Sequence, residues 1–211
     1  MRWRIAQAGL VGLLAVATGC LMPRTESRPV HTYQLSPDSE RAEIEARQVG
    51  SGAIVFVSLP QSDPGFDTQR MAYVTRPYEI SYFSANQWAD TPGRMLSPLL
   101  VKALEQTGVW QAVITAPGVV RADYRLDVSG LALAQEFLQS PSRVRLSWRA
   151  QLIDLREGHT LGTRRFEAAK DASSEDAYGG VRAANQVLGK LLSEMASWLG
   201  SCVSQRGKAA C

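Results

Sequence analysis

The segment from Arg143 to Asp154 predicts a β-strand with one buried and one solvated face, because apolar and polar side chains alternate strictly from Arg143 to Leu152. The apolar positions are Val144, Leu146, Trp148, Ala150 and Leu152, and the polar ones are Arg143, Arg145, Ser147, Arg149 and Gln151. Leu155 to His159 then predicts a turn around Gly158, and Leu161 to Ala169 predicts the returning partner strand. This segment is therefore expected to form an antiparallel hairpin.

Shorter apolar runs predict the rest of a sheet. A β-branched run bounded by Gly52 and Pro60 indicates a buried strand. A hairpin and two more strands are expected beyond it, with Gly130 at a bulge in the last of them. These strands are predicted at Ala53–Leu59, Arg70–Val74, Tyr78–Phe83, Val109–Ile114 and Asp123–Phe137.

Two stretches have helical periodicity instead. Ser97 is expected to cap a helix that has Pro98 at its first position and stops before Gly108, with an earlier turn near Asn86. From Val181 to Leu199, apolar residues recur at steps of three and four, which predicts a long helix. The fold class expected is α/β, a mixed and mostly antiparallel sheet packed against two main helices in a single domain.

The N-terminus has the pattern of a bacterial signal peptide. Arg2 and Arg4 precede an apolar stretch that is too short to span a membrane, and small residues lead to Cys20. The ending Ala17–Cys20 resembles a lipobox, which predicts that residues 1–19 are removed and that Cys20 carries diacylglycerol and palmitate. The alternative is ordinary cleavage nearby, with Cys20 a plain thiol.

The chain divides into four parts on this basis. Residues 1–19 are the signal peptide, 20–52 the lipidated N-terminus and tether with a short edge strand at Thr32–Leu35, 53–200 the domain, and 201–211 a C-terminal tail. Cys202 and Cys211 either close a small loop by a disulfide in an oxidising periplasm or remain free thiols.

Charge and motifs exclude several function classes. Removal of residues 1–19 leaves 21 basic and 20 acidic residues, so the basic footprint of a nucleic-acid binder is missing. His31 and His159 have no evident catalytic or zinc partner, and a carboxylate pair such as Asp123 with Asp127 is typical of a solvated strand face. We therefore expect no enzyme activity, no metal and no cofactor.

The candidate contact residues are three arginines and one tryptophan. Arg143, Arg145 and Arg149 share the solvated face of their strand, where they either grip anionic headgroups or an acidic partner, or pair with Asp127 and Glu167 on neighbouring strands. Trp88 is either an interface anchor or a packing residue, the commoner case. Trp148 and Trp198 lie on apolar stripes and are expected in the core.

The order and spacing of several segments resemble the ABC-type transport auxiliary lipoproteins, the PqiC-like family. The resemblance covers roughly Tyr33 to Leu199, and the residues that carry it are Asp67–Tyr73, Tyr82, Asn86, Trp88, Met95–Leu104, Gly108–Trp110, Val113, Ala122–Leu126, Gln135–Phe137, Ala183–Asn185 and Trp198. The long tether and the cysteine-bearing tail depart from the family pattern.

The resemblance implies a periplasmic lipoprotein that assists an ABC-type system in moving lipids between two membranes. It implies an MCE-domain protein as partner, a homo-oligomeric assembly and no enzyme activity. Leu21 follows Cys20 where an Asp would favour inner-membrane retention, so the outer membrane is the expected location. The alternative is an outer-membrane structural or assembly lipoprotein without a transport partner; a periplasmic hydrolase is a weaker reading.

Overall fold

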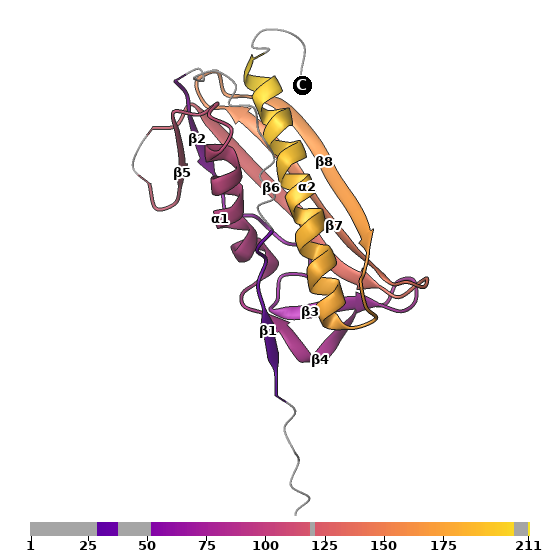
Figure 1. Cartoon of the computed structure of the whole chain (residues 1–211). Coiled ribbons are helices and arrows are strands. Elements are labelled where there is room, and N and C mark those ends of the chain that lie inside the picture. Colours follow the sequence, from indigo (N-terminus) through magenta and orange to yellow (C-terminus); the bar gives the residue numbers. More distant parts are fainter. Residues whose placement is uncertain (1–28, 38–51, 119–120, 205–210) are drawn as a thin grey trace, which may run out of the picture.

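A computed structural model of the chain describes residues 29–37, 52–118, 121–204 and 211. The expected signal peptide, Cys20 and most of the tether lie outside the described residues. Eight strands and two helices make up the described fold (Figure 1): β1 His31–Tyr33, β2 Ile54–Val57, β3 Arg70–Val74, β4 Ser81–Trp88, α1 Pro92–Glu105, β5 Ala112–Thr115, β6 Tyr124–Glu136, β7 Arg143–Asp154, β8 His159–Asp171 and α2 Ala177–Ser204.

The strands form one mixed sheet, as expected from the sequence. β6, β7 and β8 pair antiparallel over almost their whole lengths, which gives the sheet its antiparallel bulk. The free side of β6 is shared by two short parallel partners, since β2 pairs with its beginning and β3 with its end. β5 extends the sheet beyond β2, and β4 and β1 extend it beyond β3, with β1 parallel to β4 at the edge.

The bulge expected at Gly130 is present in β6. The register with β7 shifts between Ser129 and Ala132, and Gly130 has a φ of 64°, a backbone conformation that glycine adopts without steric cost. Before the bulge, Tyr124, Leu126 and Val128 face the core; after it, Leu131 and Leu133 do. The extra residue therefore keeps the apolar side of a long, twisted strand on the core.

Both helices cover the same face of the sheet, and no helix among the described residues covers the opposite face (Figure 1). We call that opposite face the open face. α2 runs along β7 and β8 and contributes Leu188, Leu191, Met195 and Leu199 to the core. Asp176 precedes the helix and accepts a hydrogen bond of 2.7 Å from the Gly179 amide, which satisfies one of the amides left without a partner in the first turn. This bond also holds the pKa of Asp176 below its usual value.

Two local predictions were wrong. α1 begins at Pro92 and not at Pro98, because Thr91 and Pro92 supply an earlier start, and the Met95 amide closes the first turn on the Thr91 carbonyl at 3.0 Å. Pro98 is accommodated inside the helix. The turn expected near Asn86 is instead part of β4, which continues to Trp88 because β1 and β3 pair with its last residues.

The core lies between the two helices and the sheet. Trp148 is 1% exposed and Trp198 is 6% exposed, which confirms the expectation that both are core residues. Phe166 of β8 lies between them, with ring centroids 6.1 Å from Trp148 and 5.7 Å from Trp198. Neither described helix is long and apolar enough to cross a membrane.

Candidate interaction surface

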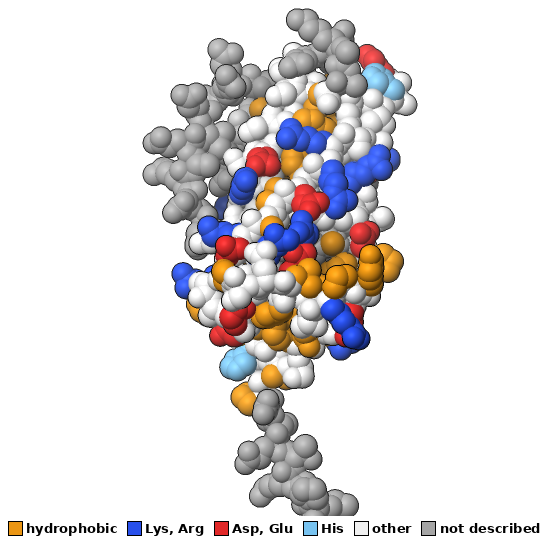
Figure 2. Space-filling view, turned by 90° about the vertical axis from the view of Figure 1, so that its right-hand side faces the viewer, with side chains coloured by type: hydrophobic (Ala, Val, Ile, Leu, Met, Phe, Trp, Pro, Cys, Tyr) orange, Lys and Arg blue, Asp and Glu red, His pale blue; other side chains and the backbone are white. Residues whose placement is uncertain are grey.

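The open face of β6, β7 and β8 carries charged side chains in opposite pairs. The guanidinium of Arg145 lies between two carboxylates, 2.7 Å from Glu136 on β6 and 2.5 Å from Glu167 on β8. Arg143 contacts Glu136 at 2.9 Å, and Arg165 contacts Glu167 at 3.0 Å. Figure 2 shows basic and acidic side chains interspersed over this side of the molecule. The face is thus covered by an ion-pair network across three strands.

Glu136 is the centre of that network. Burial alone would raise the pKa of its carboxyl, but hydrogen bonds from Arg145 and Arg143 outweigh burial and hold the pKa below its usual range. Hydrogen bonds from Arg145 and Arg165 likewise lower the pKa of Glu167. Both carboxylates therefore stay ionised to a lower pH than an ordinary Glu, and Arg143 and Arg145 keep their partners at neutral pH.

Glu136→Gln is expected to lower the free energy of unfolding by about 1–2 kcal/mol at pH 7, because two charge-assisted hydrogen bonds are weakened in a half-buried place. The folded pKa of Glu136 lies below the unfolded value of about 4.3, so its stabilising effect is full above that pH and is lost as the pH falls. Urea unfolding at pH 7 and pH 3 measures this. A difference between the two proteins that does not shrink at pH 3 would contradict it.

The three arginines expected on this face therefore differ in what they are free to do. Arg143 and Arg145 are engaged with Glu136 and Glu167, and the pairing of Arg145 with Glu167 agrees with the ion-pair alternative. Arg149 is exposed, lies opposite Arg165 in the register, and forms no ion pair with any residue that the structure describes. Of the three, Arg149 is available to an anionic group outside the domain.

The expected partner Asp127 has another role. It accepts a hydrogen bond of 2.6 Å from the Ser58 hydroxyl and contacts Arg125 at 3.1 Å. Asp123 accepts a hydrogen bond of 2.8 Å from the Ile54 amide. The carboxylate pair that the sequence indicated as a solvated face therefore fixes β2 and its following loop against β6, and Asp127 does not pair with Arg143, Arg145 or Arg149.

Trp88 lies inside the domain, which favours the packing alternative over the interface anchor. Its side chain is 4% exposed at the end of β4. It lines a small, partly open pocket beside α2, together with Met71, Leu133 and Ala184.

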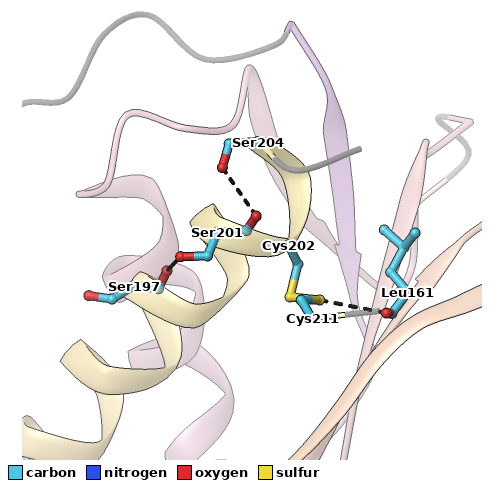
Figure 3. Close-up of a disulfide and its surroundings, with 6 residues drawn as sticks. All are labelled: Leu161, Ser197, Ser201, Cys202, Ser204 and Cys211. Atoms are coloured by element: carbon cyan, nitrogen blue, oxygen red, sulfur yellow. Dashed lines mark hydrogen bonds between the residues drawn. A yellow bond between two sulfur atoms is a disulfide. The ribbon is translucent and has the colours of Figure 1, made fainter. Parts of the chain in front are cut away.

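The C-terminal residue is fixed to the domain by a disulfide. Cys202 in the last turn of α2 is bonded to Cys211, with the two Cα atoms 5.2 Å apart (Figure 3). The Cys211 sulfur lies 3.6 Å from the Leu161 carbonyl oxygen of β8. Gly162 makes this approach possible, because a Cβ there would lie 2.7 Å from the Cys211 sulfur and 3.2 Å from the Trp198 ring.

Gly162→Ala is expected to lower the free energy of unfolding of the oxidised protein by about 1–3 kcal/mol, because the added methyl overpacks the contact between β8 and Cys211. Thr163→Ala, at the exposed neighbouring position, is the matched control. Unfolding in urea with and without a reductant measures the effect. The loss should be smaller after reduction, when Cys211 can move away; an equal loss in both states would contradict this contact.

Metal binding finds no support in the described residues, where no three His, Cys, Asp or Glu side chains are grouped closely enough to hold an ion. The described part of the fold offers surfaces for interaction and a disulfide that fixes Cys211 to α2.

The fold is that of a single α/β domain with two helices on one face of a mixed sheet. The chain belongs to the ABC-type transport auxiliary lipoprotein component family, whose model matches residues 33–196. No curated protein matches the chain. The family is that of a transport auxiliary component and not of a known enzyme.

Solved structures share the fold at low sequence identity. Protein XCC0632 from Xanthomonas campestris has a TM-score of 0.72 and 20% identity, over 85% of this chain and 99% of that one. An uncharacterised protein has a TM-score of 0.62 and 16% identity, over 81% of this chain and 99% of that one. At such identities the likeness establishes the architecture alone.

Three features of the surface were not found from the sequence. Glu136 was not named as the partner of Arg143 and Arg145, although the short connection between β6 and β7 places it opposite them. Gly162 lies within a strand, and a glycine inside a strand often marks a place where another part of the chain comes close to the backbone. Tyr78, Ile80 and Leu138 are exposed in the β3–β4 and β6–β7 turns. Their signal in the sequence is an apolar residue in a turn.

Proposed function

We propose that this protein is held at the periplasmic face of the outer membrane by lipid on Cys20. There it acts as the auxiliary component of an MCE/ABC-type system that moves lipids between the two membranes. Its part is to bind the partner proteins and not to catalyse a reaction. The observation that carries the proposal is the family match over residues 33–196, joined to a signal sequence that ends in Cys20.

The open face of the sheet is the proposed docking surface for the MCE-domain partner. Its network of Glu136, Arg143, Arg145 and Glu167 is already satisfied, so these side chains give the face rigidity and fixed charge positions. Arg149 and the adjoining Arg165 add exposed positive charge at the middle of β7 and β8. A partner with an acidic surface patch fits this face, since Arg binds carboxylates through paired hydrogen bonds.

Self-association is the second part of the proposal. β5 and β8 each have one neighbouring strand in the described sheet, so each leaves an edge with unpaired backbone groups. A homo-oligomer that covers such edges would present several copies of the open face together. Light scattering of the mature protein measures this, and a monomer at all concentrations would count against it.

Crosslinking in whole cells tests the function. The mature, lipidated protein is purified from mildly crosslinked envelopes and the captured proteins are identified by mass spectrometry, with Arg149→Glu as a comparison. Recovery of an MCE-domain protein, reduced by the substitution, supports the proposal. Recovery of only cell-wall or outer-membrane assembly proteins overturns it in favour of a structural lipoprotein.

A further inference from the structure

Exposed large hydrophobic side chains are unevenly distributed over the domain. The described residues include seven of them, and five lie on segments that meet at one end: Val30, Tyr78, Ile80, Leu138 and Tyr178. Figure 1 shows the start of β1, the β3–β4 and β6–β7 turns and the start of α2 at the lower end of the molecule. We call these five residues the hydrophobic end.

A hydrogen bond and a ring contact join these segments in two pairs. The Phe137 amide donates to the Val74 carbonyl at 2.7 Å, which fixes the β6–β7 turn beside the β3–β4 turn. Tyr33 of β1 lies 6.3 Å from Tyr178 of α2 between ring centroids. Figure 2 shows hydrophobic side chains gathered on the lower half of the molecule, with charged side chains beside and above them.

The N-terminal segment leaves the domain at the same end. Pro29 is the first described residue, and nine residue steps separate it from Cys20. An extended chain covers at most about 3.6 Å per residue, so Cys20 is no more than about 32 Å from Pro29. A lipid on Cys20 therefore brings the hydrophobic end, and not the opposite end with the disulfide, close to the membrane surface.

We infer that the hydrophobic end is a membrane-contact surface. This inference rests on the proposed function, because it takes residue 20 as the point of membrane attachment. Tyr78, Ile80 and Leu138 enter the headgroup layer from two adjacent turns, and Tyr178 stands at the start of α2 at the same end. Tyrosine suits this place because its ring is apolar and its hydroxyl reaches water. Contact at this end leaves the charged face of β6, β7 and β8 pointing sideways into the periplasm.

Two turns at opposite ends of β7 supply a matched test. Leu138 is 48% exposed before β7, and Leu155 is 40% exposed after it. Each is replaced by Cys and labelled with an environment-sensitive fluorophore in the full mature chain, with a hexahistidine segment in place of Cys20. Vesicles of phosphatidylethanolamine, phosphatidylglycerol and a nickel-chelating lipid then hold the chain by its N-terminus, whether or not the natural chain is lipidated.

The expected result is an emission shift to shorter wavelength and quenching by nitroxide-bearing lipid at position 138, with neither change at position 155. If the emission and the quenching are the same at both positions, in chains that float with the vesicles, the inference is overturned. That result does not bear on lipidation of Cys20. A blue shift at position 138 that appears without vesicles and rises with protein concentration would assign the surface to a second copy, and would overturn it too. Mass spectrometry of the native N-terminus decides lipidation separately.

Discussion

With Cys20 replaced by Ser, the secreted protein is expected to leave the membrane fraction and to appear free in the periplasm. The change is Cys20→Ser in a chain placed behind an ordinary cleavable signal peptide, so that processing does not depend on lipidation. Each CH₂ buried in a bilayer contributes roughly 0.8 kcal/mol, and stable attachment requires more than one acyl chain. Loss of all the chains at once therefore removes nearly all of the attachment.

The matched control for this prediction is the double variant Cys202→Ser and Cys211→Ser, which opens the disulfide but keeps Cys20. It is expected to fractionate with the outer membrane like the unaltered protein. Separation of the two membranes by density, followed by immunoblotting, gives the measurement. A Cys20→Ser protein that stays with the outer membrane in full amount would show that another contact anchors the chain.

Leu188→Ala is expected to have the largest effect on stability, a loss of about 2–5 kcal/mol in the free energy of unfolding. Leu188 is fully buried in the middle of α2, where the helix packs over β7 and β8. Truncation removes three carbons from a closely packed layer and leaves a cavity that the rigid sheet cannot fill.

Gln186→Ala is the control, since Gln186 is exposed on the same helix and alanine favours helix formation. It is expected to change the free energy by less than about 0.5 kcal/mol. Urea unfolding followed by circular dichroism measures both variants. A Leu188→Ala loss no greater than that of the control would contradict the packing of α2 as the main cover of the sheet.

The sheet and the long helix were predictable because periodicity reports burial directly. The alternation over Arg143–Asp154 and the three- and four-residue spacing in α2 each specify one buried face, and both elements lie where they were expected. Gly130 was identifiable as a bulge because a glycine interrupted an otherwise regular strand. The start of α1 was missed because Thr91–Pro92 and Ser97–Pro98 carry the same local start signal, and tertiary packing chooses between them.

The surface was less predictable because its contacts depend on register between strands. The partners of Arg143 and Arg145 were assigned to Asp127 and Glu167, yet the hairpin turn length brings Glu136 between them. The burial of Trp88 depends on β1, β3 and α2 all meeting at the end of β4, which no local pattern encodes. The hydrophobic end likewise arises only when segments far apart in sequence are brought together.

Binding of this domain to a protein of a lipid-transport system is tested most directly by titration. The purified mature protein is titrated with the periplasmic part of the MCE-domain protein from the same cell, in calorimetry or by surface-bound interferometry. The prediction is saturable binding at micromolar concentrations or tighter, weakened when Arg149→Glu places a negative charge on the open face. No binding at concentrations where both proteins remain folded and soluble would contradict the claim.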